Sequence, residues 1–118
     1  MKVFVSFAAW LSFAAAGAAL AGNYSFLDEA PAKHFTDQDI QLLTDAVNDA
    51  LENSADGNIT AWRNPETDAS GKLKPLETYQ SEGITCRRLQ IANKAGGLKN
   101  NVAFNFCRQT DNTWKLID

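Results

Sequence analysis

Reactive side chains are scarce in this 118-residue chain, which contains two cysteines and a single histidine, His34. Cysteines separated by twenty residues do not form the C-x-x-C pattern of redox enzymes, and one distant histidine gives no zinc-site spacing. A Ser-His-acid or Cys-His arrangement would require His34, in an irregular stretch, to dock against the rest of the fold. We therefore expect no enzyme, no metal and no cofactor.

Basic charge is also sparse, with 11 lysines and arginines against 14 acidic residues and a net charge of −3. No segment of the sequence concentrates basic residues, whereas nucleic acids and anionic membrane surfaces attract a basic patch. We therefore expect no nucleic-acid partner. The carboxylate pair Asp37 and Asp39 fits the start of a helix better than a calcium site.

The N-terminal segment has the pattern of a secretory signal peptide. Lys2 precedes an apolar run over residues 3–18, and Ala19-Leu20-Ala21 matches the small-residue cleavage pattern. An uncleaved membrane anchor is the alternative, but the run is alanine-rich and lacks a charged stop-transfer flank. The sequence predicts a signal peptide over residues 1–21. No cysteine follows it, so the usual bacterial lipid anchor is not expected.

What remains is short enough for one domain. Residues 22–35, which include Pro31, lack a periodic pattern and predict a flexible lead-in. Residues 36–118 then form the single domain, which we expect to be a monomer. Export favours a periplasmic, outer-membrane or cell-surface location.

Cys86 and Cys107 lie equally far in sequence from the dipeptide Gly96-Gly97. A two-residue turn at these glycines, which accept the positive φ angles of a tight hairpin, places the cysteines directly opposite. Side-chain alternation supports this register, because one face then collects the apolar residues Leu89, Ile91, Val102, Phe104 and Phe106. The other face, with both cysteines, Arg88, Gln90, Asn101 and Asn105, is expected to be wetter. In an exported chain the two cysteines would be oxidised to a disulfide, and this bridge would add about 3 kcal/mol of stability by closing the loop between them.

The other elements predict an α+β fold, with one N-terminal helix packed on a small antiparallel β meander of four to five strands, held by the disulfide. Thr36 can cap a helix that ends near Asn53, and its apolar stripe consists of Ile40, Leu43, Val47, Ala50 and Leu51. Strands are expected over residues 59–63, 73–79, 84–93, 98–108 and 114–117. Pro75 predicts that the second of these strands lies at an edge of the sheet.

Residues 50–118 resemble the C-terminal domain of the 17-kilodalton surface antigen family of bacterial envelopes. The matching positions, in order, are Ala50-Leu51-Glu52, Trp62-Arg63-Asn64-Pro65, Gly71, Pro75, Tyr79, Cys86-Arg87, Cys107-Arg108, Trp114 and Leu116-Ile117. The resemblance implies an exported envelope protein, often associated with the outer membrane, with no reaction assigned to the family. Larger members resemble lipoproteins with a glycine-rich hydrophobic segment, and this chain has neither that segment nor the lipidated cysteine.

Several motif residues allow both a binding and a structural interpretation. Trp62 and Trp114 could form an aromatic platform for a glycan, although tryptophans of small domains more often belong to the core. Arg87 and Arg108 could hold a carboxylate or phosphate of an envelope polymer. We favour pairing of these arginines with local acids such as Glu82 and Asp111.

Asn64-Pro65 is most simply a turn. We expect a structural or binding module whose partner is an envelope protein or polymer. The alternative is a soluble periplasmic inhibitor or accessory module that acts on an envelope hydrolase, and an enzyme ranks third.

Overall fold

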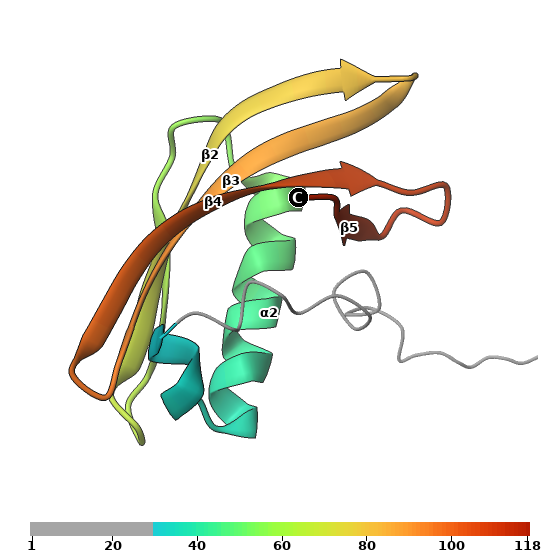
Figure 1. Ribbon diagram of the computed structural model, residues 1–118. Helices are drawn as coiled ribbons and strands as arrows, with labels where there is room; N and C mark the ends of the chain where they lie inside the picture. The colour runs from blue at the N-terminus through green and yellow to red at the C-terminus, as the bar shows by residue number, and fades with distance from the viewer. Residues whose placement is uncertain (1–29) are drawn as a thin grey trace, which may run out of the picture.

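One long helix and a five-stranded antiparallel sheet make up the fold (Figure 1). The computed structural model describes residues 30–118, so the predicted signal peptide lies outside the described residues. In chain order the elements are the 3-10 helix η4 (Ala30–His34), the helix α2 (Asp37–Asn53) and the strands β1 (Thr60–Asn64), β2 (Ala69–Ser81), β3 (Ile84–Ala95), β4 (Leu98–Arg108) and β5 (Trp114–Leu116). The predicted α+β class, with one helix on a β meander, is confirmed.

Helix α2 begins at the predicted cap. The Thr36 hydroxyl accepts a hydrogen bond from the Asp39 amide at 3.1 Å, and the Asp39 carboxylate accepts one from the Thr36 amide at 2.9 Å. This reciprocal pair is a capping box, which satisfies two amides that a helix start otherwise leaves free. The apolar stripe then faces the sheet, where Leu43, Val47, Ala50 and Leu51 are buried. Ile40, the first residue of the stripe in sequence, is partly exposed.

The strands follow one another in the order β1-β2-β3-β4-β5, each antiparallel to the next. Helix α2 covers one face of the sheet, which we call the inner face, and the strands curve around the helix (Figure 1). The opposite face, which no described element covers, is the outer face. The largest inner-face contributors to the core are Trp62, Leu73, Leu89, Ile91, Phe106 and Trp114.

The β3–β4 hairpin has the predicted register. Leu89 pairs with Phe104, Ile91 pairs with Val102, and the cysteines pair with each other. Gly96 and Gly97 have φ angles of 58° and 79°, the left-handed conformations that a tight turn of this type requires. A side chain at Gly96 would also collide with the His34 ring, 2.6 Å from the ideal Cβ position.

The edge prediction for Pro75 is wrong for the strand as a whole, because β2 lies between β1 and β3. Strand β1 is short, however, and its pairing with β2 stops at Leu73. Beyond that point β2 has a single neighbouring strand, and the register with β3 shifts between Pro75 and Glu77. Proline is therefore tolerated where no partner strand needs its missing N–H.

The part of the predicted lead-in that the structure describes is packed onto the domain. Helix η4 contacts β3 and β4, and Pro31 is fully buried. Phe35 meets Trp62 edge to face, with ring centroids 5.4 Å apart. Residues 22–29 lie outside the described residues; beyond them Pro31 is buried, Ala32 and Phe35 are partly buried, and Lys33 and His34 are exposed. The helices within residues 30–118 are too short or too polar to span a bilayer.

Candidate functional site

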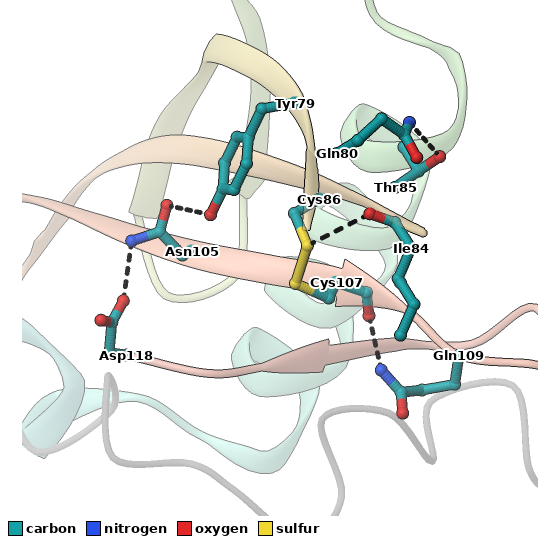
Figure 2. The surroundings of a disulfide bond; sticks show 9 residues. All are labelled: Tyr79, Gln80, Ile84, Thr85, Cys86, Asn105, Cys107, Gln109 and Asp118. Atoms are coloured by element: carbon teal, nitrogen blue, oxygen red, sulfur yellow. Dashed lines mark hydrogen bonds between the residues drawn. A yellow bond between two sulfur atoms is a disulfide. The ribbon is translucent and has the colours of Figure 1, made fainter. Parts of the chain in front are cut away.

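The predicted disulfide joins Cys86 and Cys107, whose Cα atoms lie 4.0 Å apart across β3 and β4. Both cysteines are buried, so this end of the outer face is drier than expected. Beside the bridge, the Tyr79 hydroxyl donates to Asn105 Oδ1 at 3.0 Å, and the Asn105 amide donates to Asp118 at 2.7 Å (Figure 2). Tyr79 therefore ties β2 to the C-terminal strands through a hydrogen-bonded chain.

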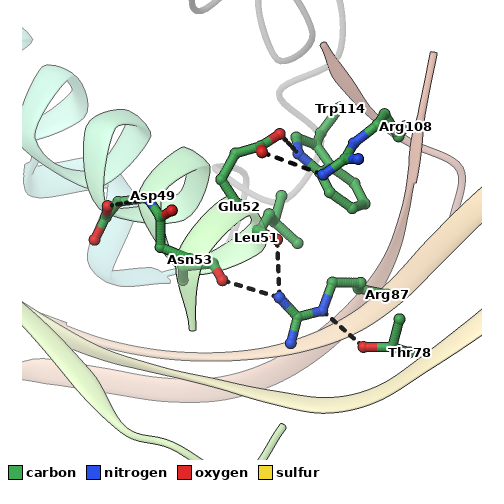
Figure 3. A network of polar contacts seen from close by, with 9 residues as sticks. Asp49, Leu51, Glu52, Asn53, Thr78, Arg87, Arg108 and Trp114 are labelled. Carbon is green, nitrogen blue, oxygen red and sulfur yellow. Dashed lines mark hydrogen bonds and ion pairs between the residues drawn. The ribbon is translucent and has the colours of Figure 1, made fainter. Parts of the chain in front are cut away.

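Arg87 lies on the inner face, beneath the C-terminal end of α2 (Figure 3). Its Nη1 donates to the Leu51 carbonyl oxygen at 2.8 Å, and also to the Ala50 carbonyl oxygen at 3.2 Å, which accepts from the backbone N–H of Ser54 as well. Its Nη2 pairs with Asp56 at 2.8 Å, and its Nε donates to the Thr78 hydroxyl at 2.9 Å. The hydrogen bond from Arg87 lowers the pKa of the Asp56 carboxyl. Arg87 therefore fastens the helix end to the sheet.

Arg108 and Trp114 share one carboxylate of the same helix end. Glu52 accepts from Arg108 Nη2 at 3.1 Å and from the Trp114 indole N–H at 2.7 Å (Figure 3). The guanidinium of Arg108 also stacks over the Trp114 ring, 4.9 Å from its centroid, which is a cation–π contact. The partners of the two arginines are thus Asp56 and Glu52, and the named pairs with Glu82 and Asp111 are wrong. Both true partners lie more than thirty residues away in sequence and reach the arginines through packing.

Asn64-Pro65 forms the predicted turn and also anchors the helix start. The Asn64 side-chain oxygen accepts from the Glu66 amide, and its NH2 donates to Asp39 at 2.7 Å. Burial would raise the pKa of the Asp39 carboxyl, but hydrogen bonds from the Thr36 backbone, Thr67 and Asn64 outweigh it and hold that pKa below its usual value. The contribution of Asp39 was missed in the sequence, although its place three residues after Thr36 marks a capping box.

Gly71 makes room for a contact between two buried side chains. The Trp62 indole N–H crosses over Gly71 to donate to Asn93 Oδ1 at 3.2 Å. A Cβ at Gly71 would collide with both of these side-chain atoms and with the Ala92 carbonyl. Trp62 is 6% exposed and Trp114 is 2% exposed, so neither offers an aromatic platform for a glycan.

The predicted site residues therefore separate into the disulfide end, the C-terminal end of α2 and the β1–β2 turn. In each place they donate to or accept from groups of this same chain, although the buried Arg108 Nε has no hydrogen-bond partner among the described residues. Among residues 30–118 no three histidine, cysteine or acidic side chains gather in a way that could hold a metal ion. Asn64, Arg87, Arg108 and Trp114 thus build a scaffold, and a binding surface would have to use other side chains of the domain.

A groove crosses the outer face near the Gly96-Gly97 end of the sheet. Its main hollow has a volume of about 650 Å³ and its floor includes the small side chains Ala61 and Ala92. A second hollow of about 170 Å³ continues from it, and the two share Lys72, Ala92 and Asn101. We call the two together the outer groove.

Positive charge gathers in the outer groove. Its lining includes five basic residues and no acidic one: Arg63, Lys72, Lys74, Lys94 and Lys99. Helix α2, on the other side of the sheet, carries five acidic residues and no lysine or arginine. The interpretation of the basic residues as dispersed is therefore wrong in three dimensions. They alternate with other residues along four strands, β1 to β4, and strand pairing brings them to one face.

Comparison with known proteins gives one family. A family model described as "17 kDa outer membrane surface antigen" matches residues 49–115. The 17 kDa surface antigen of Rickettsia prowazekii is 34% identical over 83 residues, which cover 70% of this chain and 52% of that protein. The antigen of Rickettsia conorii is 32% identical over the same length and coverage. The chain thus spans about half the length of these relatives. No solved structure matches.

Proposed function

The chain belongs to the 17 kDa outer membrane surface antigen family, and we propose that its domain is a non-enzymatic binding module of the bacterial envelope that holds its partner in the outer groove. Family membership supports an exported envelope protein. The role of a binding module and the place of binding are our proposal. It rests on one observation: the polar groups of Asn64, Arg87 and Trp114 are engaged within the scaffold, whereas the outer groove lies open.

The two faces of the sheet differ in what covers them, and this difference supports the proposal. The inner face is closed by α2, whose stripe of Leu43, Val47 and Leu51 is buried against it. The outer face has no such cover among the described residues, and it is hollowed where the side chains are small. Concave, accessible surface with polar groups at its rim is where proteins usually hold ligands.

Site-specific photo-crosslinking in intact bacteria tests the proposal. A photoreactive residue replaces Ala61 or Ala92 in the groove, in the full chain expressed with its own N-terminal segment. Ala55, which is exposed and follows α2, provides the matched control position. We expect envelope adducts from the two groove positions and none from Ala55. Adducts from Ala55 alone, or from no position in correctly exported protein, would show that the outer groove is not the binding surface.

A further inference from the structure

We propose that the outer groove binds an acidic polysaccharide of the bacterial envelope, with its lysines on the carboxylate, sulfate or phosphate groups of the polymer. This inference rests on the proposed function and names the partner class of that same surface. Three features of the groove support it: its five basic side chains, the neutral polar side chains between them, and the small number of aromatic and acidic side chains in its described lining.

The placement of the basic side chains in the groove lowers the stability of the fold. Lys94 on β3 and Lys99 on β4 are directly opposite each other. Like charges in a cross-strand pair are destabilising, because their side chains stand only a few ångströms apart. Neither lysine has an ion-pair partner among residues 30–118, and the same holds for Lys72 and Lys74. An anionic ligand would relieve this repulsion.

Arg63 completes the row of charge across the sheet. It pairs with Ser70 on β2, which in turn pairs with Lys94. Its contact with Asp68 is long, at 3.8 Å, and both side chains are largely exposed, at 66% and 89%. Exposed pairs of this kind contribute little energy, so Arg63 remains available to a ligand.

Neutral hydrogen-bonding groups lie among the cations. Ser70, Gln90 and Asn101 line the groove, and the Gln90 amide donates to Asn101 at 3.0 Å. Hydroxyl and amide groups donate and accept at once, which matches the hydroxyls of a sugar chain. Alternation of fixed cations with such groups fits a polymer that carries both acidic groups and hydroxyls.

The lining gives less support to the other polyanions. Proteins that hold single-stranded nucleic acid stack its bases on aromatic side chains. Trp62 is the one aromatic residue among the described residues that line the groove, and its indole is engaged by Asn93 on the buried side. A lipid bilayer meets several protruding apolar side chains beside basic ones, whereas the described lining of the groove offers one, Ile59 at 60% exposed, and its floor has the small side chains of Ala61 and Ala92. Nucleic acid and anionic lipid are therefore alternative outcomes of the test.

The experiment measures binding of heparin oligosaccharides, as a soluble acidic polysaccharide, by calorimetry to the full exported protein. Desulfated, N-acetylated heparin is the matched ligand with fewer charges. Lys72→Glu and Lys94→Glu alter the groove, and Lys115→Glu is the matched control. Lys115 is an exposed strand lysine opposite Cys107, so it lies at the disulfide end of the same sheet, away from the groove.

We expect each groove variant to weaken heparin binding about five-fold or more, as for a lysine near an anionic surface. The double variant should weaken it further, Lys115→Glu should have less than about a two-fold effect, and the desulfated ligand should bind weakly to all proteins. Thermal unfolding confirms that the variants are folded. Equal losses in the groove and control variants would overturn the proposal, since they would indicate net charge alone. Absence of heparin binding would also overturn it, as would equally tight, groove-dependent binding to single-stranded DNA or phosphatidylglycerol vesicles.

The crosslinking experiment separates this inference from the proposed function. If Ala61 and Ala92 yield envelope adducts while heparin fails to bind, the groove is a binding surface for another class of partner. If heparin binds in the groove but no adducts form in cells, the chemistry is right and the envelope role is wrong.

Discussion

At one end of the β3–β4 hairpin the arginine side chains form ion pairs, and at the other end, within the described part of the chain, the lysine side chains do not. At the disulfide end, Arg87 and Arg108 each meet a carboxylate, and Arg87 also binds two helix carbonyls. At the turn end, Lys94 and Lys99 face each other without an ion pair in the described part of the chain. Paired charge fixes the scaffold, whereas unpaired charge of one sign is available to a ligand. Substitutions at the two ends should therefore affect different measurements.

Removal of the disulfide should have the largest effect on stability. Cys86→Ser with Cys107→Ser should lower the free energy of unfolding by about 3 kcal/mol, because the unfolded chain regains the freedom of a closed loop of some twenty residues. Urea denaturation measures the loss, and reduced wild-type protein should match the variant. The hairpin register should persist in amide exchange, since side-chain alternation selects it as well. A shifted register would show that the bridge alone determines the pairing.

The next largest effect is expected at Arg87, which is compared with Arg88, its neighbour in sequence. Arg87→Met should lower the free energy of unfolding by about 2 kcal/mol, because it removes the Arg87 hydrogen bond to the buried Leu51 carbonyl, although the Ala50 carbonyl keeps the Ser54 N–H as donor. The pair with Asp56 adds little to this figure, since that carboxylate is 43% exposed. Arg88→Met, on the outer face, is the control and should change stability by less than about 0.5 kcal/mol. Equal losses would contradict the assignment of Arg87 as the helix anchor.

Asp39 gives the scaffold a dependence on pH. Its pKa is lower in the folded protein than its ordinary value of 3.8, so its stabilisation is complete above that value and is lost as the pH falls through the folded pKa. Asp39→Asn should lower the free energy of unfolding by about 1 kcal/mol at neutral pH. The difference in free energy of unfolding between Asp39→Asn and the wild type should become smaller below pH 3.8. Asp45→Asn, on the exposed face of α2, is the control in acid denaturation, and a constant difference would exclude this role of Asp39.

The smallest effect belongs to the unpaired end and has the opposite sign. Lys94→Glu should raise the free energy of unfolding by about 0.5 kcal/mol at low salt, because it turns a repulsive cross-strand pair into an attractive one. Lys99→Glu should do the same, and the double variant should return toward the wild-type value. Thermal unfolding at two salt concentrations measures the cycle. Destabilisation by both single variants would show that these lysines support the fold instead of a ligand.

Local sequence signals predicted the elements well and their partners poorly. The capping residue Thr36, the glycine pair and the alternation around it predicted the helix start and the hairpin register, because each depends on residues close in the chain. The arginines were correctly expected to be paired, but their acids were misassigned to residues near them in sequence. Asp56 and Glu52 come from the end of α2, and only the docking of that helix brings them to the sheet.

The same limit explains why the outer groove was missed. Lys94 and Lys99 lie equally far from the glycine pair, so the hairpin register already places them opposite each other. Lys72, Lys74 and Arg63 join them only through the pairing of β1 with β2 and of β2 with β3. Pro75 was misleading for a related reason, since a strand can be internal over one half and have an open side over the other.

The sequence by itself determined the class of fold, the helix, the β3–β4 register and the cysteine pair, because periodicity and turn chemistry act over short distances along the chain. The tertiary structure decided which acid each arginine meets, that Trp62 turns inward over Gly71, and that five cations line one groove. These contacts join strands and a helix far apart in sequence. Their geometry follows from the order and curvature of the whole sheet, which no local pattern encodes.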